Sequence, residues 1–174
     1  MNLAVLGSGG REHAICYKLH QSKKLGKLLC IPGNAGTEKI AENIKIDLGN
    51  FEEIYKTIKT KNIEIVIVGP EQPLVEGIVD FLRQRSVKVI GPDKFSSQLE
   101  GSKSLMKNIC KKNNIPTANY GVFDNLNKAE IFLKKNGTPI VVKADGLAAG
   151  KGVRICEAFD EAKIKIKEIL DGKF

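Results

Sequence analysis

A glycine cluster near the amino terminus has the residue types of an anion-binding turn. Gly9 and Gly10 follow a short apolar run and precede a stretch whose apolar residues recur at helical spacing. Such a turn presents free backbone N–H groups and the positive end of a helix dipole, so we expect an anion there. Arg11 can pair with a phosphate, and Glu12 can accept hydrogen bonds from hydroxyl groups or an amine. An alternative role for Glu12 is to cap the helix from its first turn.

Two further loops carry polar side chains directly after predicted strands. Asn34 follows the apolar run 28–31, and Glu71 follows the β-branched run 63–68. In an open sheet of parallel strands, the ligand crevice lies at the carboxyl ends of the strands. We therefore expect Asn34 and Glu71 to lie with the glycine turn around one pocket. Ordinary turn punctuation is the alternative, and it explains the glycines and prolines of these loops but not the polar side chains.

A second glycine-rich segment, 144–152, lies between two predicted strands. It is not a Walker A loop, because Asp145 stands where the first glycine is required and Gly152 stands where a Ser or Thr would bind magnesium. Lys143 on the entering strand, Lys151 in the loop and several backbone N–H groups can close over phosphates. We predict a lid, and an ordinary hairpin loop is the alternative.

Other chemistries find less support in the sequence. The glycine cluster lacks the third glycine of a dinucleotide fingerprint, because Glu12 stands there, and no acidic residue ends the second predicted strand. His13 and His20 have no neighbours that complete a metal set, and the four cysteines form no C-x-x-C pair. We therefore expect reduced, buried thiols and neither NAD nor a zinc site.

Apolar periodicity assigns the elements that must position these loops. Strands are predicted at 2–6, 28–31, 63–68 and 87–90, alternating with helical stretches whose apolar faces include Leu19, Ile54 and Leu82. Strands that alternate with helices predict a parallel sheet with helices on both faces.

The pattern changes after Pro92, which places a domain boundary near residue 100. The segment 93–114 is predicted to form two helical stretches with a break at Gly101 and Ser102. Beyond it we predict strands at 120–123, 140–143 and 153–156, a helix at 126–135, and a final helix containing Ala162, Ile166 and Ile169. The predicted domains are 1–100 and 101–174.

Composition is that of a soluble globular protein of 174 residues, long enough for a sizeable core. The 28 basic and 20 acidic residues give a net charge of +8, but 24 of the basic residues are lysine. Arginine is the residue that makes bidentate contacts with bases and phosphates, so this ratio argues against nucleic acid as a partner. The residue pattern at the amino terminus predicts neither a signal peptide nor a membrane span, and we expect a cytoplasmic protein with no membrane partner.

Five motifs in order resemble those of the glycinamide ribonucleotide synthetase family of the ATP-grasp superfamily. They are GSGGREH at 7–13, PGNAGT at 32–37, GPEQPL at 69–74, LEGSK at 99–103 and VKADGLAAGKGV at 142–153. The last motif is very specific, and the resemblance covers the whole chain.

The resemblance implies an enzyme of de novo purine biosynthesis that joins glycine to 5-phosphoribosylamine with ATP and Mg²⁺ through an acyl phosphate. It implies an α/β fold in which a Rossmann-like parallel-sheet domain precedes the beginning of an ATP-grasp domain. Another ATP-grasp ligase and a non-catalytic ligand-binding fragment remain alternatives. The segments 7–13 and 69–74 distinguish this family from other ATP-grasp ligases, because in the family they form the pocket that selects the substrate.

Site residues follow from the resemblance by position. The phosphoribosylamine pocket is carried by Gly9, Gly10, Arg11, Glu12, Asn34 and Glu71. The nucleotide site is carried by the phosphate lysines Lys103 and Lys143 and by the covering loop with Asp145, Gly146, Gly150, Lys151 and Gly152. Leu105 stands where the family often has an aromatic residue. The magnesium ligands are expected beyond Phe174, so no metal ligand is assigned, and the 174-residue chain alone is expected to be inactive.

Overall fold

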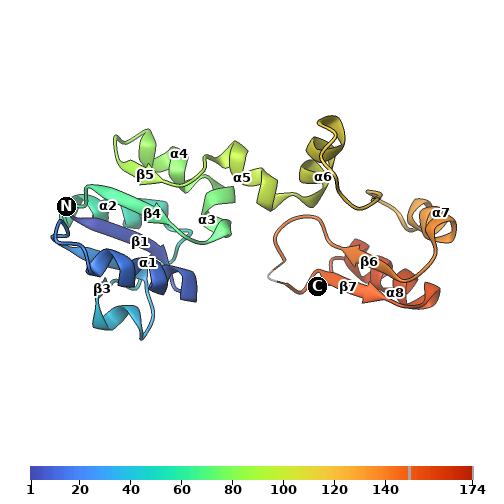
Figure 1. Cartoon of the computed structure of the whole chain (residues 1–174), viewed down its shortest axis with the longest axis horizontal. Helices are drawn as coiled ribbons and strands as arrows, with labels where there is room; N and C mark the ends of the chain where they lie inside the picture. Colours follow the sequence, from blue (N-terminus) through green and yellow to red (C-terminus); the bar gives the residue numbers. More distant parts are fainter. Residues whose placement is uncertain (149, 174) are drawn as a thin grey trace. The chain divides into compact units, whose positions relative to one another are not determined.

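The computed structural model describes residues 1–148 and 150–173, which divide into two compact units, 1–98 and 99–174 (Figure 1). Each unit has its own hydrophobic core. The helices in the described part of the chain are too short or too polar to cross a bilayer. All four cysteines are free; Cys110 is half-buried and the others are buried, close to the sequence expectation.

The first unit contains the predicted parallel sheet, which has five strands where the sequence predicts four. Its strands are β1 (Leu3–Gly7), β2 (Leu28–Pro32), β3 (Glu42–Asn43), β4 (Ile65–Val68) and β5 (Lys88–Ile90). They lie in the order β3-β2-β1-β4-β5. The chain therefore builds outward from β1 on one side and returns to β4 on the other. In open sheets of parallel strands, ligands commonly bind at such a reversal, which here falls at the carboxyl ends of β1 and β4.

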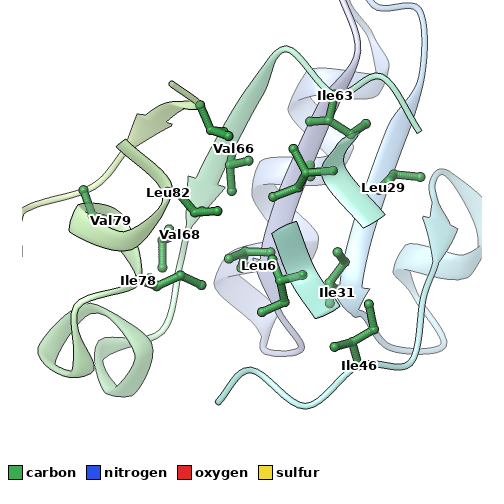
Figure 2. Packing of buried hydrophobic residues seen from close by; sticks show 14 of the residues in the cluster. Leu6, Leu29, Ile31, Ile46, Ile63, Val66, Val68, Ile78, Val79 and Leu82 are labelled. Carbon is green, nitrogen blue, oxygen red and sulfur yellow. The ribbon is translucent and has the colours of Figure 1, made fainter. Parts of the chain in front are cut away.

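Alternating side chains of the central strands face two separate cores. Leu3 and Val5 pack with Cys16 of helix α1 (Gly10–His20). Ala4 and Leu6 point to the opposite face, which is covered by helix α2 (Phe51–Thr60) and helix α4 (Ile78–Arg83). Figure 2 shows this larger core around Leu6. Because successive strand residues face opposite sides, a sheet buried on both faces needs the nearly continuous apolar runs seen in the sequence.

Two features of the first unit differ from the predicted elements. The helical stretch predicted around Leu82 is divided into two short helices, α3 (Glu71–Glu76) and α4. The break falls at Gly77, whose φ of +103° is a left-handed conformation that glycine adopts at little cost. The short strand β3 and the 3-10 turn η1 (Thr37–Lys39) were not predicted, because two paired residues leave no periodic pattern.

The second unit consists of a small hairpin packed on helices. Helices α5 (Lys94–Gly101) and α6 (Lys103–Lys112) form the two predicted stretches, with Ser102 between them, and α5 begins in the first unit. The antiparallel strands β6 (Ile140–Lys143) and β7 (Val153–Cys156) pack with α7 (Leu126–Asn136) and α8 (Phe159–Leu170). The buried residues of this core are Leu133, Cys156 and Ala162.

The strand predicted at 120–123 is wrong, because the structure has no strand in that segment. Its aromatic side chains pack on helices instead of pairing across a sheet. The Tyr120 hydroxyl donates to Asn108 Oδ1 at 2.8 Å, and the ring centroids of Phe123 and Phe132 lie 5.2 Å apart. A short aromatic run is typical of a strand in sequence, but helix packing uses the same residue types.

Ile54 tests the larger core of the first unit. Its side chain is fully buried on α2, so Ile54→Ala removes three buried carbons and is expected to lower the free energy of unfolding by about 2–5 kcal/mol. Ile90→Ala is the matched control, because Ile90 is 58% exposed and should cost about 1 kcal/mol or less. Urea unfolding followed by far-UV circular dichroism measures both. Equal losses would contradict this assignment of the core.

Candidate functional site

Glu12 lies buried at the base of the glycine turn, with 3% of its surface exposed. Its Oε2 accepts a hydrogen bond from the Gly9 backbone N–H at 2.6 Å, which closes a capping box at the first turn of α1. Its Oε1 has no hydrogen-bond partner within the described structure. The side chain therefore caps the helix, as the alternative interpretation of the sequence held, and it also leaves one buried acceptor unsatisfied.

Three glycines make room for this carboxylate. A Cβ at Gly69 would lie 2.2 Å from Glu12 Oε1, and a Cβ at Gly7 would lie 2.5 Å from Glu12 Cγ. Gly9 is similarly close, whereas a Cβ at Gly10 would meet nothing within 4 Å. The carboxyl ends of β1 and β4 can therefore approach the first turn of α1 only because these positions lack side chains.

Arg11 and Glu71 join the first and third loops above this buried carboxylate. Arg11 Nη2 donates to Glu71 Oε1 at 2.8 Å, and both side chains are partly exposed. The Glu71 backbone amide and the Arg11 guanidinium hold the pKa of the Glu71 carboxyl below its ordinary value. The pair therefore offers a cation and an anion side by side at the sheet edge.

Asn34 joins the second loop to the glycine turn. Its Nδ2 donates to Ser8 O at 2.9 Å, and its Oδ1 accepts from the backbone amides of Gly36 and Thr37 at 2.7 and 3.0 Å. The side chain thus uses both its donor and its acceptor on the protein itself. Together with the Arg11–Glu71 pair, this contact confirms that the structure brings the three predicted loops together.

Thr37 and Asn43 complete this loop and were not predicted as site residues. The fully buried Thr37 hydroxyl donates to Asn34 O at 2.9 Å, and Asn43 Nδ2 donates to the same carbonyl at 2.8 Å. Thr37 belongs to the PGNAGT motif, which was the available signal. Asn43 lies in β3, for which the sequence shows no periodic pattern.

A hollow of about 680 Å³ lies beside the Asn34 loop. It is lined by Pro32, Gly33, Asn34, Ala35, Glu38, Asn43, Lys45, Ile46 and Asp47. This lining shares Asn34 with the predicted pocket but includes neither the glycine turn nor Glu71. The three joined loops and the hollow are thus neighbouring features rather than one cavity.

The second glycine segment closes on itself and on helix α6. The backbone amide of Ala144 donates to Gly152 O at 2.7 Å, and the amide of Lys151 donates to Ala148 O at 2.8 Å. The Lys103 ammonium donates to Gly146 O at 2.6 Å. Positive φ angles at Gly146 and Gly150, +87° and +78°, favour glycine at both positions. Ala149, which the sequence analysis includes in this loop, lies outside the described residues.

Lys143 and Asp145 occupy different surroundings at the base of this loop. Lys143 ends β6 as an exposed residue opposite Val153. The Asp145 carboxylate turns to α6, where it accepts hydrogen bonds from the Ser102 hydroxyl and from the amide and hydroxyl of Ser104. The structure therefore brings together Lys103, Asp145 and Gly146. No group of three or more possible metal-ligating side chains occurs among residues 1–148 and 150–173.

Gly69→Ala tests the packing of Glu12. The added methyl group must displace the carboxylate or the β4 loop, so we expect a loss of about 1–3 kcal/mol in unfolding free energy. Gly10→Ala is the control, because its Cβ enters open space at the helix start. Thermal unfolding measures both variants. Gly69→Ala is then repeated in a Glu12→Ser background. An equal loss of unfolding free energy in both backgrounds would show that the clash is not with this carboxylate.

Two family models together match the whole chain. The family model described as phosphoribosylglycinamide synthetase, N domain, matches residues 1–100, and the one described as phosphoribosylglycinamide synthetase, ATP-grasp (A) domain, matches residues 101–174. The chain is 46% identical to phosphoribosylamine–glycine ligase of Mesorhizobium japonicum, with 100% of this chain and 41% of that protein covered. For the Clostridium acetobutylicum protein of the same name, identity is 46%, with 98% and 41% covered. The chain thus spans about two fifths of the length of these relatives.

Solved structures agree with this assignment. The structure of phosphoribosylamine–glycine ligase from Thermotoga maritima superimposes with a TM-score of 0.80 at 34% identity, over 99% of this chain and 40% of that one. A 2-oxoglutarate carboxylase biotin carboxylase domain from Hydrogenobacter thermophilus, crystallised with MgADP, gives 0.75 at 20% identity over 99% and 41%. The second likeness extends to the fold alone. On the family matches and these identities, the chain belongs to the phosphoribosylglycinamide synthetase family.

Proposed function

We propose that the protein is an ATP-dependent ligase that joins glycine to 5-phosphoribosylamine, giving glycinamide ribonucleotide, ADP and phosphate. The observation that carries the proposal is identity of 44–47% along almost the whole chain to relatives named phosphoribosylamine–glycine ligase. Both family models belong to the same synthetase, which favours this reaction over that of another ATP-grasp ligase. A cytoplasmic location fits this role and belongs to the proposal.

The chemistry needs activation rather than a side-chain nucleophile. A carboxylate is a poor electrophile, so a glycine carboxylate oxygen first attacks the γ-phosphorus of ATP, and the bond to ADP breaks. The amine of phosphoribosylamine then attacks the acyl carbon of glycyl phosphate, loses a proton, and inorganic phosphate leaves. The protein contributes positioning and cations that balance the charge of the transferred phosphoryl group.

In this proposal the joined loops of the first unit bind phosphoribosylamine. The first turn of α1, which starts at Gly10, offers backbone N–H groups to the phosphate, with Arg11 beside it, and Gly9 shapes the turn while its own N–H is bonded to Glu12. Glu71 and the unsatisfied Glu12 Oε1 are acceptors for the amine or hydroxyl groups of the sugar. Asn34 holds two of the loops in register.

The second unit binds the ATP phosphates. Lys103 and Lys143 supply positive charge, and the backbone amides of the loop from Gly146 to Gly152 cover the triphosphate, with Lys151 in the same loop. Residues 101–174 carry 14 basic and 8 acidic side chains, which favours an anionic ligand. Mg²⁺ accompanies ATP in this chemistry, but the described residues contain no suitable ligand set, so no step is assigned to the metal.

Arg11→Ala and Glu71→Ala test the first site in the full-length gene product. Each variant removes a charged hydrogen-bonding group from the proposed sugar-phosphate pocket, so we expect the KM for phosphoribosylamine to rise roughly tenfold or more. The KM for ATP should change by less than about twofold. Lys18→Ala, an exposed lysine on the same helix, should leave both constants unchanged. An equal rise in both constants, or none, would contradict this pocket assignment.

Hydrogen exchange tests the loop at residues 146–148 and 150–152. ATP should slow amide exchange there, because phosphate oxygens would accept the amide hydrogens in place of water. Lys143→Met should weaken this protection, since it removes a cation from the strand that enters the loop. Lys134→Met, an exposed lysine on α7, should behave as wild type. Exchange that ATP leaves unchanged in wild type would favour the ordinary hairpin.

A further inference from the structure

Asp145 is anchored to the start of helix α6. Ser102 is the N-cap of this helix, and its hydroxyl lies 3.2 Å from Asp145 Oδ2. The Ser104 amide donates to Asp145 Oδ1 at 3.2 Å, and the Ser104 hydroxyl donates to Oδ2. The carboxylate therefore satisfies a backbone amide of the first turn and lies at the positive end of the helix dipole.

Hydrogen bonding keeps this carboxylate ionised although the contact removes some water from it. Burial pushes the pKa of Asp145 upward, but hydrogen bonds from Ser104 and from the Gly146 amide outweigh this effect, and the pKa lies below its ordinary value. The anchor is therefore charged at neutral pH, and charge-assisted hydrogen bonds are the stronger kind.

Lys103 makes the second contact between the same two segments. Its ammonium donates to Gly146 O at 2.6 Å, next to the anchored Asp145. The N-cap and the first two residues of α6, 102–104, thus contact two successive residues at the base of the glycine loop. A lysine side chain has four rotatable carbon–carbon bonds, so its ammonium can occupy many positions. When the distance between the start of α6 and the base of the glycine loop is fixed, far fewer positions allow the ammonium to contact the loop.

Lys103 and Asp145 would respond differently to a bound nucleotide. A neutral carbonyl is a weaker partner for an ammonium than a phosphate oxygen, so an arriving triphosphate can take over Lys103 from Gly146. The Asp145 carboxylate itself repels phosphate and is already occupied by serine hydroxyls and amides. Direct nucleotide contact, which the sequence analysis expected of Asp145, is therefore disfavoured by charge and by geometry.

We propose that Asp145 is a positioning residue, which clamps the first turn of α6 to the base of the glycine loop and so places the Lys103 ammonium for the ATP phosphates. The proposal rests on the proposed ligase function. Ser104, which lies outside the sequence motifs, has a positioning role as well, because it holds the Asp145 carboxylate.

The test compares Asp145→Asn, Ser104→Ala and the double variant in the full-length gene product. Steady-state assays measure ADP release with ATP and glycine varied separately. We expect the KM for ATP to rise roughly tenfold in Asp145→Asn and roughly threefold in Ser104→Ala. The double variant should be no worse than Asp145→Asn, because both changes break one shared contact. The KM for glycine should stay unchanged in all three.

Two conservative controls separate positioning from folding. Ser104→Thr keeps the hydroxyl and should retain the wild-type KM for ATP, and Asp124→Asn alters an exposed carboxylate elsewhere in the unit and should change nothing. A role in folding alone would lower the active fraction and kcat while leaving the KM for ATP unchanged, and would overturn the proposal. A direct contact of Asp145 with nucleotide would also overturn it, and would appear as a normal KM in Ser104→Ala.

Failure of the ligase function has a separate signature. A wild-type protein that releases no ADP with glycine and phosphoribosylamine contradicts the proposed function. In that case calorimetric titration with ATP replaces the kinetic assay, and the same variants should show the same order of affinities. Equal ATP affinity in wild type, Asp145→Asn and Ser104→Ala would then overturn the positioning role as well.

Discussion

The packing of the Glu12 carboxylate against three glycines sets how closely helix α1 approaches the ends of β1 and β4. Glu12 is buried between the ends of β1 and β4, and a carboxylate in such surroundings needs hydrogen bonds to offset its lost hydration. The Gly9 amide supplies one, and the second oxygen remains unsatisfied. Side chains at Gly7 or Gly69 would separate the loops, so the close approach of α1 to both strands depends on this arrangement.

The outer contacts of the first unit build on that close approach. Arg11 leaves the same turn of α1 in the direction of Glu71, and Asn34 reaches the turn from the other side. Their distances are short because the three loops start from neighbouring parallel strands, whose carboxyl ends share one edge. The proposed phosphosugar substrate carries a phosphate, hydroxyl groups and an amine, which would pair with the N–H groups, the cation and the acceptors that result.

In the second unit, which has a smaller core, polar contacts hold the loops in place. Leu133, Cys156 and Ala162 are its clustered buried residues, so packing alone orders few of its loops. Asp145 and Lys103 instead join the start of α6 to the base of the glycine loop through hydrogen bonds. Such contacts hold the base of the loop, while farther along it a Cβ at Gly150 would meet nothing within 4 Å.

The sequence by itself determined the parallel sheet, the helix break at Ser102 and the convergence of the three loops, because apolar periodicity and strand direction are local patterns. It also determined the family through motifs that need no structure. Only the tertiary structure decided which way side chains turn: Glu12 inward beneath Gly69, and Asp145 toward Ser104. Only the structure showed that the aromatic residues of 120–123 pack on helices instead of forming the predicted strand. These outcomes depend on partners distant in sequence, and spacing along the chain carries no information about them.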